Sequence, residues 1–250
     1  MDKSDFIRYY LFEGFKGLVA FTTTRQTLEI ENPRFTGDLP EIFLNARKSL
    51  AEKLGIEADQ LVFPRQEHTN CIAEINQIPD IEIKATDALI TNKRGICLCV
   101  QTADCVPILL FDPVKQVIAA VHAGWRGTVK KIVASTIDQM ISNYHSNPKD
   151  ILAAIGPSIS PEVYEVGDEV VAEARKSLPE PEKALILNIS GKYHFNLWEA
   201  NRQLLVSTGI LKQSIEISGE CSFSNPNKYF SARRDGIKTG RMVSGIMIKK

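Results

Sequence analysis

Residues 87–122 restrict the possible folds more than any other stretch of the sequence. They hold four apolar, β-rich runs separated by short polar turns, which read DALIT, GICLCVQ, VPILLFD and QVIAAVH. Runs of this length bounded by turn residues are typical of β-strands. Further strands are predicted at residues 17–24, at ILAAIG and at the final MVSGIMI. The spacing of apolar residues also predicts four helices, which cover residues 38–54, Gly127 or Thr128 to Asn143, residues 167–177 and residues 196–207. Strands clustered in mid-chain among helices predict mixed β-sheets in an α+β or layered α/β domain.

Composition narrows the class of protein. The 250 residues, with 44% apolar and 24% charged side chains and no internal repeat, predict one soluble globular domain over residues 1–250. Thirty basic and thirty acidic residues give no net charge, which argues against non-specific binding of nucleic acid. No apolar run approaches the roughly 18 residues of a membrane span, and the N-terminus lacks a signal-peptide pattern. Five cysteines without a C-x-x-C pair indicate free thiols, so a cytoplasmic protein is expected.

Three residues at the ends of predicted elements could hold a metal. His68 lies in the polar segment PRQEHTN, Cys105 lies in QTADCVPILL just before a strand, and His122 ends the strand VIAAVH. A thiolate and two imidazoles form a plausible set of three zinc ligands with a fourth position left open, as in catalytic zinc sites. Their spacing matches no short metal-binding pattern. From the residues alone, two structural histidines and a buried cysteine remain the alternative.

Five longer motifs give these residues a context. TDALITN, CVQTADCVPILLFD, AAVHAGWRGT, AAIGPSIS with YEVGDEV, and YFSARRDGIKTGR occur in order between about residues 61 and 245 and closely resemble the YfiH family, also catalogued as the multicopper polyphenol oxidase or laccase-domain family. The sequence departs from the family pattern in two places. In CSFSNPNKYF, Ser222 replaces the threonine of many relatives but retains the hydroxyl group, and the residues before about 60 match only weakly.

The resemblance implies a fold, a metal and an activity. It implies a layered α/β/β/α fold, similar to the catalytic domain of the cytotoxic necrotizing factor toxin. It implies a zinc ion held by a histidine, the ADC cysteine and the HAGWRG histidine, here His68, Cys105 and His122. Members of the family are described as purine nucleoside phosphorylases that also deaminate adenosine and cleave methylthioadenosine. The expected partners are therefore purine nucleosides and phosphate, with neither nucleic acid nor membrane, and the expected assembly is a monomer or homodimer.

Phosphorolysis needs an anion site beside the ribose. Arg126, next to Gly127 at a predicted helix start, offers a guanidinium and backbone N–H groups, and Arg233 and Arg234 in SARRD are further candidates. A solvated ion pair with the following aspartate is the alternative for the last two. Deamination would also need an acid or base near the metal, and the nearest carboxylates in sequence are Asp104 and Glu67. The H-x-E and P-C-x-x-C signature of cytidine-deaminase-type enzymes is absent.

Other functions would make different demands on the same residues. A multicopper oxidase needs many more histidines than the remaining His145 and His194 can supply, although a single copper ion could occupy the zinc ligands in vitro. A cysteine hydrolase, including one that edits peptidoglycan precursors, would use Cys105 as nucleophile and His122 as base. A non-catalytic zinc-binding domain would have a closed ligand shell. Trp125 could stack on a purine or anchor the HAGWRG turn.

Overall fold

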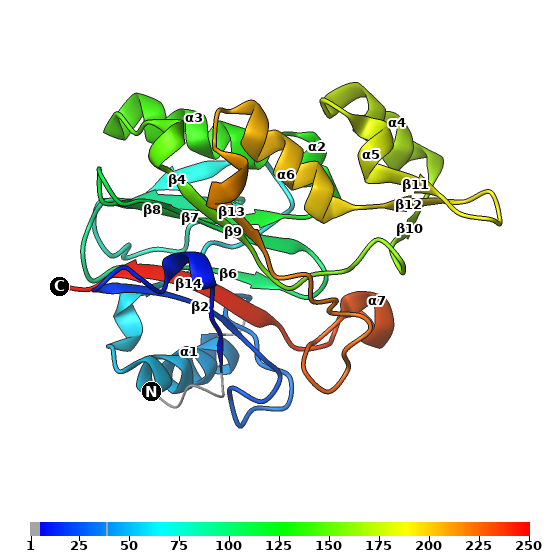
Figure 1. The fold of residues 1–250 in the computed structure, drawn as a ribbon. Helices are drawn as coiled ribbons and strands as arrows, with labels where there is room; N and C mark the ends of the chain where they lie inside the picture. Colours follow the sequence, from blue (N-terminus) through cyan, green and yellow to red (C-terminus); the bar gives the residue numbers. More distant parts are fainter. Residues whose placement is uncertain (1–5, 39) are drawn as a thin grey trace.

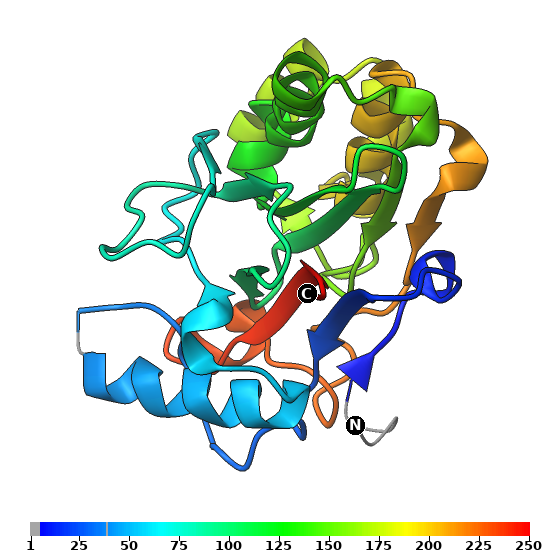
Figure 2. The ribbon, with the colours of Figure 1, turned by 90° about the vertical axis from the view of Figure 1, so that its left-hand side faces the viewer.

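The chain folds into four layers, which are clearest in Figure 1. The computed structural model describes residues 6–38 and 40–250. One helix covers the outer face of a five-stranded sheet, this sheet packs on a six-stranded sheet, and a group of helices covers the outer face of the second sheet; Figure 2 shows the same order from the side. This arrangement confirms the layered α+β fold with mixed sheets that the sequence predicts, while the likeness to the toxin domain stays a prediction.

The five-stranded sheet has the order β1-β2-β14-β6-β3. Its strands are β1 (Phe6–Ile7), β2 (Leu18–Thr23), β14 (Met242–Ile248), β6 (Cys97–Thr102) and β3 (Leu61–Val62). Helix α1 (Pro40–Leu54) packs Ala46, Leu50 and Ala51 against the outer face of this sheet. The helix predicted from residue 38 is therefore confirmed from Pro40 onward, and Leu39 lies outside the described residues.

The six-stranded sheet has the order β13-β9-β7-β8-β5-β4. Its strands are β13 (Ile215–Ile217), β9 (Leu152–Ile155), β7 (Val106–Asp112), β8 (Val117–Ala123), β5 (Ala88–Thr91) and β4 (Ile72–Glu74). Strand β8 runs antiparallel to both β7 and β5, and β4 runs parallel to β5. The beginnings of β4, β5 and β7 therefore meet the end of β8 at one edge of the sheet.

The four predicted strands of residues 87–122 are all present, but they do not form one sheet. Strand β6 pairs with β14 and β3 in the five-stranded sheet, while β5, β7 and β8 build the other sheet. All these strands are buried on both faces, so alternation of polar and apolar residues could not indicate their neighbours. Apolar side chains such as Leu98, Leu109 and Ile246 fill the space between the sheets.

The remaining helices lie mostly over the six-stranded sheet. They are α2 (Trp125–Val129), α3 (Ile132–Tyr144), α4 (Asp168–Ser177), α5 (Pro181–Ala184) and α6 (Leu197–Ser207), with α7 (Ala232–Asp235) apart from them near the start of β14 (Figure 1). A small third sheet contains β10 (Glu165–Val166), β12 (Tyr193–Phe195) and β11 (Leu185–Leu187), and single 3₁₀ turns lie at η1 (Tyr10–Phe12), η2 (Ala58–Gln60), η3 (Pro148–Asp150) and η4 (Lys212–Ser214).

The prediction of one helix from Gly127 or Thr128 to Asn143 is wrong. Helix α2 begins earlier, at Trp125, and the chain is interrupted at Lys131, whose φ of 60° lies in the left-handed region. This turn separates two helices that both contribute to the same core through Val129 and Ile132. Among the described residues, no helix is long and apolar enough to cross a membrane.

Candidate metal centre

His68, Cys105 and His122 meet at the sheet edge where β4, β5 and β7 begin. Cys105 directly precedes β7, and the pairing of Pro107 with His122 brings it beside the end of β8. His68 lies in the segment that leads into β4, which runs parallel to β5. The ligand atoms of the three side chains all lie within 4.8 Å of one another, with Sγ of Cys105 3.7 Å from Nε2 of His68. Within residues 6–38 and 40–250 this is the only group of three or more such side chains placed to hold a metal.

The three side chains fit a zinc ion by donor type and spacing. Tetrahedral zinc with Zn–S and Zn–N distances of about 2.3 and 2.0 Å places sulfur and nitrogen ligands roughly 3.5 Å apart. The 3.7 Å between Cys105 and His68 is close to that value. His145 and His194 lie elsewhere: His145 ends helix α3, and His194 contacts the carbonyl oxygen of Pro161 and Asn188. The centre therefore offers one metal site with three ligands.

Asp87 connects two of the three candidate ligands. His122 donates from Nδ1 to Oδ1 of Asp87 at 2.7 Å, and the backbone N–H of His68 donates to the same carboxylate oxygen at 3.1 Å. Thr69 adds a backbone and a hydroxyl donor at 2.7 and 2.8 Å. Burial alone would raise the pKa of Asp87, but the bonds from His122 and Thr69 outweigh it and lower the pKa to about 2. The carboxylate fixes the His122 ring with Nε2 free for a metal.

The sequence analysis overlooked Asp87, although a signal was present. It lies at the start of the apolar run DALIT and is fully buried. An acid that precedes a buried strand must find donors inside the protein, because a buried charge without partners is costly. At this position the donors come from His122 in β8 and from the segment that carries His68.

Cys105 and His122 shift each other's protonation. Burial favours the neutral thiol, yet His122 and His68 lower the pKa of Cys105 to about 6. Burial also disfavours the His122 imidazolium, yet Cys105 and Asp87 raise the pKa of His122 to about 9. Near neutral pH the metal-free pair is therefore thiolate and imidazolium, and the sulfur is already in the form that binds metals.

The backbone around the centre is tightly constrained. His68 and Asp104 have φ angles of 59° and 93°, a region that side chains other than glycine seldom adopt. Gly124 caps helix α2, and a Cβ atom there would lie 2.9 Å from Sγ of Cys105 and 3.1 Å from Cδ2 of His68. Only glycine at this position leaves space for both side chains.

A small cavity of about 100 Å³ opens beside the ligands. Its lining combines a metal ligand pair with aromatic, apolar and charged side chains: His68, Asp104, Cys105, Trp125, Arg126, Ile159, Tyr164 and Leu197. The Arg126 guanidinium lies 4.3 Å from the ring centroid of Trp125, and that of Arg233 lies 5.1 Å from the ring of Tyr164. Burial and the nearby Cys105 raise the pKa of Tyr164, so its hydroxyl stays protonated. Sequence reasoning had not identified Tyr164.

The other charged residues predicted from the sequence fall into two groups, those that line the cavity and those that bind other parts of the protein. Asp104 lines the cavity, but its two oxygens accept from the Ser222 hydroxyl and the backbone N–H of Arg233, both at 2.7 Å. Arg234 donates to the carbonyl oxygens of Ser222, Phe223 and Tyr229 at 2.6–2.9 Å, and it also pairs with Asp235. Its guanidinium therefore holds loops together. Glu67 is exposed, 3.8 Å from Arg65, and is not part of the cavity lining.

Comparison with known proteins gives a consistent picture. Residues 26–249 match the family model described as multi-copper polyphenol oxidoreductase laccase. The chain is 36% identical to the purine nucleoside phosphorylase of Bacteroides thetaiotaomicron, over 97% of this chain and 96% of that protein. It is 37% identical to adenosine deaminase RL5 from an unknown prokaryotic organism, over 100% and 99% of the two chains. The crystal structure of the Bacillus licheniformis hypothetical protein YfiH superposes with a TM-score of 0.90 at 35% identity, covering 99% of this chain and 98% of that one.

Proposed function

This chain belongs to the multi-copper polyphenol oxidoreductase laccase family, and from that premise we propose that it is a zinc-dependent purine nucleoside phosphorylase with adenosine deaminase activity. The substrates would be adenosine, inosine or methylthioadenosine together with phosphate. Relatives that carry the names of both activities support the proposal over nearly the whole length of the chain. The observation that carries it is the His68–Cys105–His122 group, of which His68 and Cys105 line the same cavity as Arg126.

The residues suit a centre that binds metal and substrate together. A zinc ion held by His68, Cys105 and His122 would supply a Lewis acid with one position open to water or substrate. Asp87 keeps His122 in the orientation that a metal needs. Ser222 and the backbone N–H of Arg233 hold Asp104 at the cavity wall, close to where the sugar or base would lie.

Arg126 is the best-placed residue to bind phosphate. Phosphorolysis forms a bond between a phosphate oxygen and C1′ of ribose and breaks the bond from C1′ to the purine. A guanidinium beside the reacting centre holds the phosphate dianion by charge-assisted hydrogen bonds. Arg126 is exposed, rests on Trp125 and lines the cavity, while Arg233 lies on Tyr164 nearby. Arg234, whose donors serve backbone carbonyls, is a weaker candidate.

The size of the cavity limits how a nucleoside can bind. About 100 Å³ is well below the roughly 300–1,000 Å³ of pockets that enclose a small molecule. The reacting atoms would therefore enter the cavity while the rest of the nucleoside lies across its mouth. Trp125 and Tyr164 would offer aromatic surfaces to the base there.

A second candidate function, a cysteine hydrolase, has one specific observation in its favour. Cys105, His122 and Asp87 form a chain of thiolate, imidazolium and carboxylate, in which the pKa of Cys105 is lowered to about 6 and that of His122 is raised to about 9. A thiolate bound to zinc is not free to attack a carbonyl carbon, so the two functions need different states of the same residue. Peptidoglycan-precursor editing would belong to this second candidate. A zinc-binding domain without activity is the third, and its closed ligand shell would leave no room for substrate.

The decisive experiment measures metal content and turnover on the same preparation. We expect about one zinc per chain and phosphate-dependent release of free base from inosine, with ammonia release from adenosine as the deaminase signal. Removing the metal with a chelator should abolish both activities, and zinc should restore them. A cysteine hydrolase would instead gain activity without metal and lose it on alkylation of Cys105. Zinc-loaded protein that turns over neither substrate would overturn the proposal. After loading with copper, we expect at most one copper ion per chain.

The remaining features fit a cytoplasmic enzyme. All five cysteines are free, as a reducing compartment requires. We propose a monomer or a homodimer that binds neither nucleic acid nor membrane, and sedimentation measurements would separate the two assemblies.

A further inference from the structure

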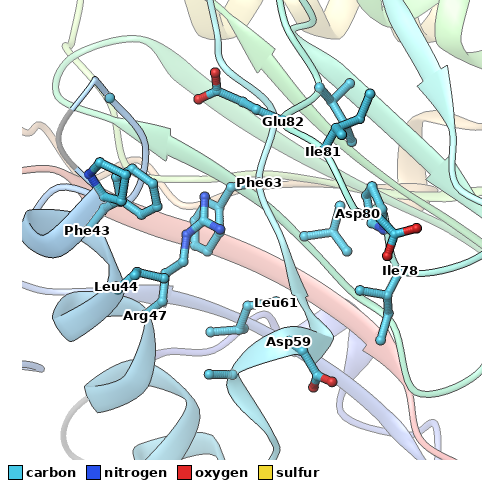
Figure 3. A pocket seen from close by; sticks show the side chains of 16 residues that line it. Phe43, Leu44, Arg47, Asp59, Leu61, Phe63, Ile78, Asp80, Ile81 and Glu82 are labelled. Atoms are coloured by element: carbon cyan, nitrogen blue, oxygen red, sulfur yellow. The ribbon is translucent and has the colours of Figure 1, made fainter.

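A second cavity shares no lining residue with the cavity at the candidate metal centre. It is about 510 Å³ in size, between helix α1, the η2 turn and the segment 78–83. This volume lies within the range of pockets that enclose a small molecule. Its wall is mainly apolar, with Phe43, Leu44, Leu61, Phe63, Ile78 and Ile81 among the lining residues (Figure 3).

One charged side chain, Arg47, reaches into this apolar cavity. Its guanidinium lies 4.7 Å from the ring centroid of Phe43 and 4.9 Å from that of Phe63, and Figure 3 shows it in front of the Phe63 ring with Phe43 to one side. Phe63 is itself stacked on Phe35 at 5.2 Å, and Nε of Arg47 donates to the carbonyl oxygen of Phe35 at 2.7 Å. The guanidinium is therefore held by one backbone hydrogen bond and by contact with two aromatic rings.

Arg47 has no carboxylate partner among the described residues. Glu82, whose charge acts on Arg47 and which lines the same cavity, is paired with Arg65 at 3.6 Å, and Arg65 also pairs with Asp38. Burial lowers the pKa of Arg47, which reflects the cost of removing the charge from water. A half-buried cation that is fixed and unpaired is expensive for a protein, and an anion in the cavity would offset that cost.

The donors that remain on Arg47 indicate which anion would bind. Nε already donates to the carbonyl oxygen of Phe35, which leaves the Nη N–H groups, and these match the two oxygens of a carboxylate. Asp59, Asp80 and Glu82 also line the cavity, and their charges would repel a dianion such as a phosphate ester more strongly than a monoanion. The apolar wall requires the rest of the ligand to be apolar.

We propose that this cavity is a second ligand site, which binds a small apolar monocarboxylate with its carboxylate on Arg47 and its apolar body against Phe43, Phe63, Ile78 and Ile81. The site is independent of the proposed phosphorylase activity, because the two cavities have no lining residue in common.

Calorimetric titration of the zinc-loaded protein tests the proposal with two probes of nearly equal shape. 2-Naphthoate carries the carboxylate, and 2-naphthamide replaces it with a neutral amide. We expect one 2-naphthoate per chain, bound at least tenfold more tightly than the amide. Equal affinity for the two probes would overturn the proposal.

Matched variants locate the bound probe. Arg47→Gln should weaken 2-naphthoate at least tenfold and remove the preference over the amide, whereas Lys48→Gln, an equal charge change at an exposed neighbour on α1, should not. Arg126→Gln should also leave the affinity unchanged, and a loss there would place the carboxylate at the metal centre and overturn the proposal. Ile81 is 82% exposed, so Ile81→Asp removes apolar wall without disturbing the core and should weaken both probes, with Val114→Asp at a 66% exposed position as control. Unchanged binding by Ile81→Asp would contradict the assignment even if Arg47→Gln failed to fold.

Discussion

Nδ1 of His122 lies 2.7 Å from Oδ1 of Asp87, and both side chains are almost completely excluded from solvent. The bond ties a strand end to the first residue before a neighbouring strand. The same carboxylate also receives the backbone N–H of His68, so one buried acid sets the position of two candidate metal ligands that are far apart in sequence. Asp87 thus orients both candidate ligands toward the same site.

Replacing Asp87 with asparagine should weaken zinc binding about 10- to 100-fold, because the His122 ring loses its charged acceptor. Competition with a chelating dye measures the affinity. Asp112→Asn is a suitable control, since Asp112 is equally buried but serves only the turn at Val114 and Lys115. Equal zinc affinity in the Asp87 variant and the wild type would contradict this role.

Gly124→Ala should remove the metal while leaving the fold intact. The new methyl group would lie 2.9 Å from the Cys105 sulfur, closer than van der Waals contact allows. Gly167→Ala provides the matched control, because Gly167 also caps a helix, has φ of −83° against −70° for Gly124, and has open space around it. Zinc content by mass spectrometry and thermal melting together separate loss of metal from loss of fold. Full zinc content in Gly124→Ala would show that the ligands can move aside.

Zinc affinity should rise with pH between about 7 and 9. In the metal-free protein Cys105 is already a thiolate above its pKa of about 6, while His122 keeps a proton up to its pKa of about 9. Metal binding must displace that proton, so the apparent affinity should increase about tenfold per pH unit and level off above pH 9. Below pH 6 the thiolate also takes a proton and the dependence should steepen. A pH-stat titration at pH 7.5 measures the protons that zinc binding releases. One proton per zinc would support this scheme, and no release would refute it.

Arg126 and Arg234 should respond differently to alanine substitution. Arg126 is exposed, so Arg126→Ala should leave thermal stability nearly unchanged while raising the KM for phosphate about tenfold or more. Arg234 donates to three backbone carbonyls, so Arg234→Ala should destabilise the fold by about 2–4 kcal/mol. Denaturant unfolding and initial rates at varied phosphate measure the two effects. A normal KM for phosphate in Arg126→Ala would move the phosphate site elsewhere, with Arg233 next to be tested.

The sequence predicts where the strands and helices lie better than it predicts which strands pair with each other. Four apolar runs between residues 87 and 122 are strands, as expected, yet β6 joins a different sheet from β5, β7 and β8. Strands buried on both faces carry no alternation that would indicate which neighbour they pair with. The interruption between α2 and α3 could not be predicted either. Lys131 has a left-handed backbone conformation, and this does not alter the apolar spacing of the two helices that it separates.

The three candidate ligands are predicted mainly from sequence motifs, whereas the residues that hold them in place are seen only in the structure. His68, Cys105 and His122 were identified through the resemblance, and the structure brings their ligand atoms together. Asp87 and Tyr164 were missed, since the partners that give them a role lie far away in sequence. The internal bonds of Arg234 were equally unpredictable, because three carbonyl oxygens converge on it only in the folded chain.

Strand β14 has a consequence for how this protein is made. It pairs with both β2 and β6 in the middle of its sheet, yet it follows all other strands in the sequence. While a ribosome is still translating the preceding residues, β2 and β6 lack the partner that joins them and present open, apolar edges. The sheet-to-sheet core must therefore close late, after Met242–Ile248 have left the exit tunnel, and a nascent chain stalled before that point would be a natural client for chaperones.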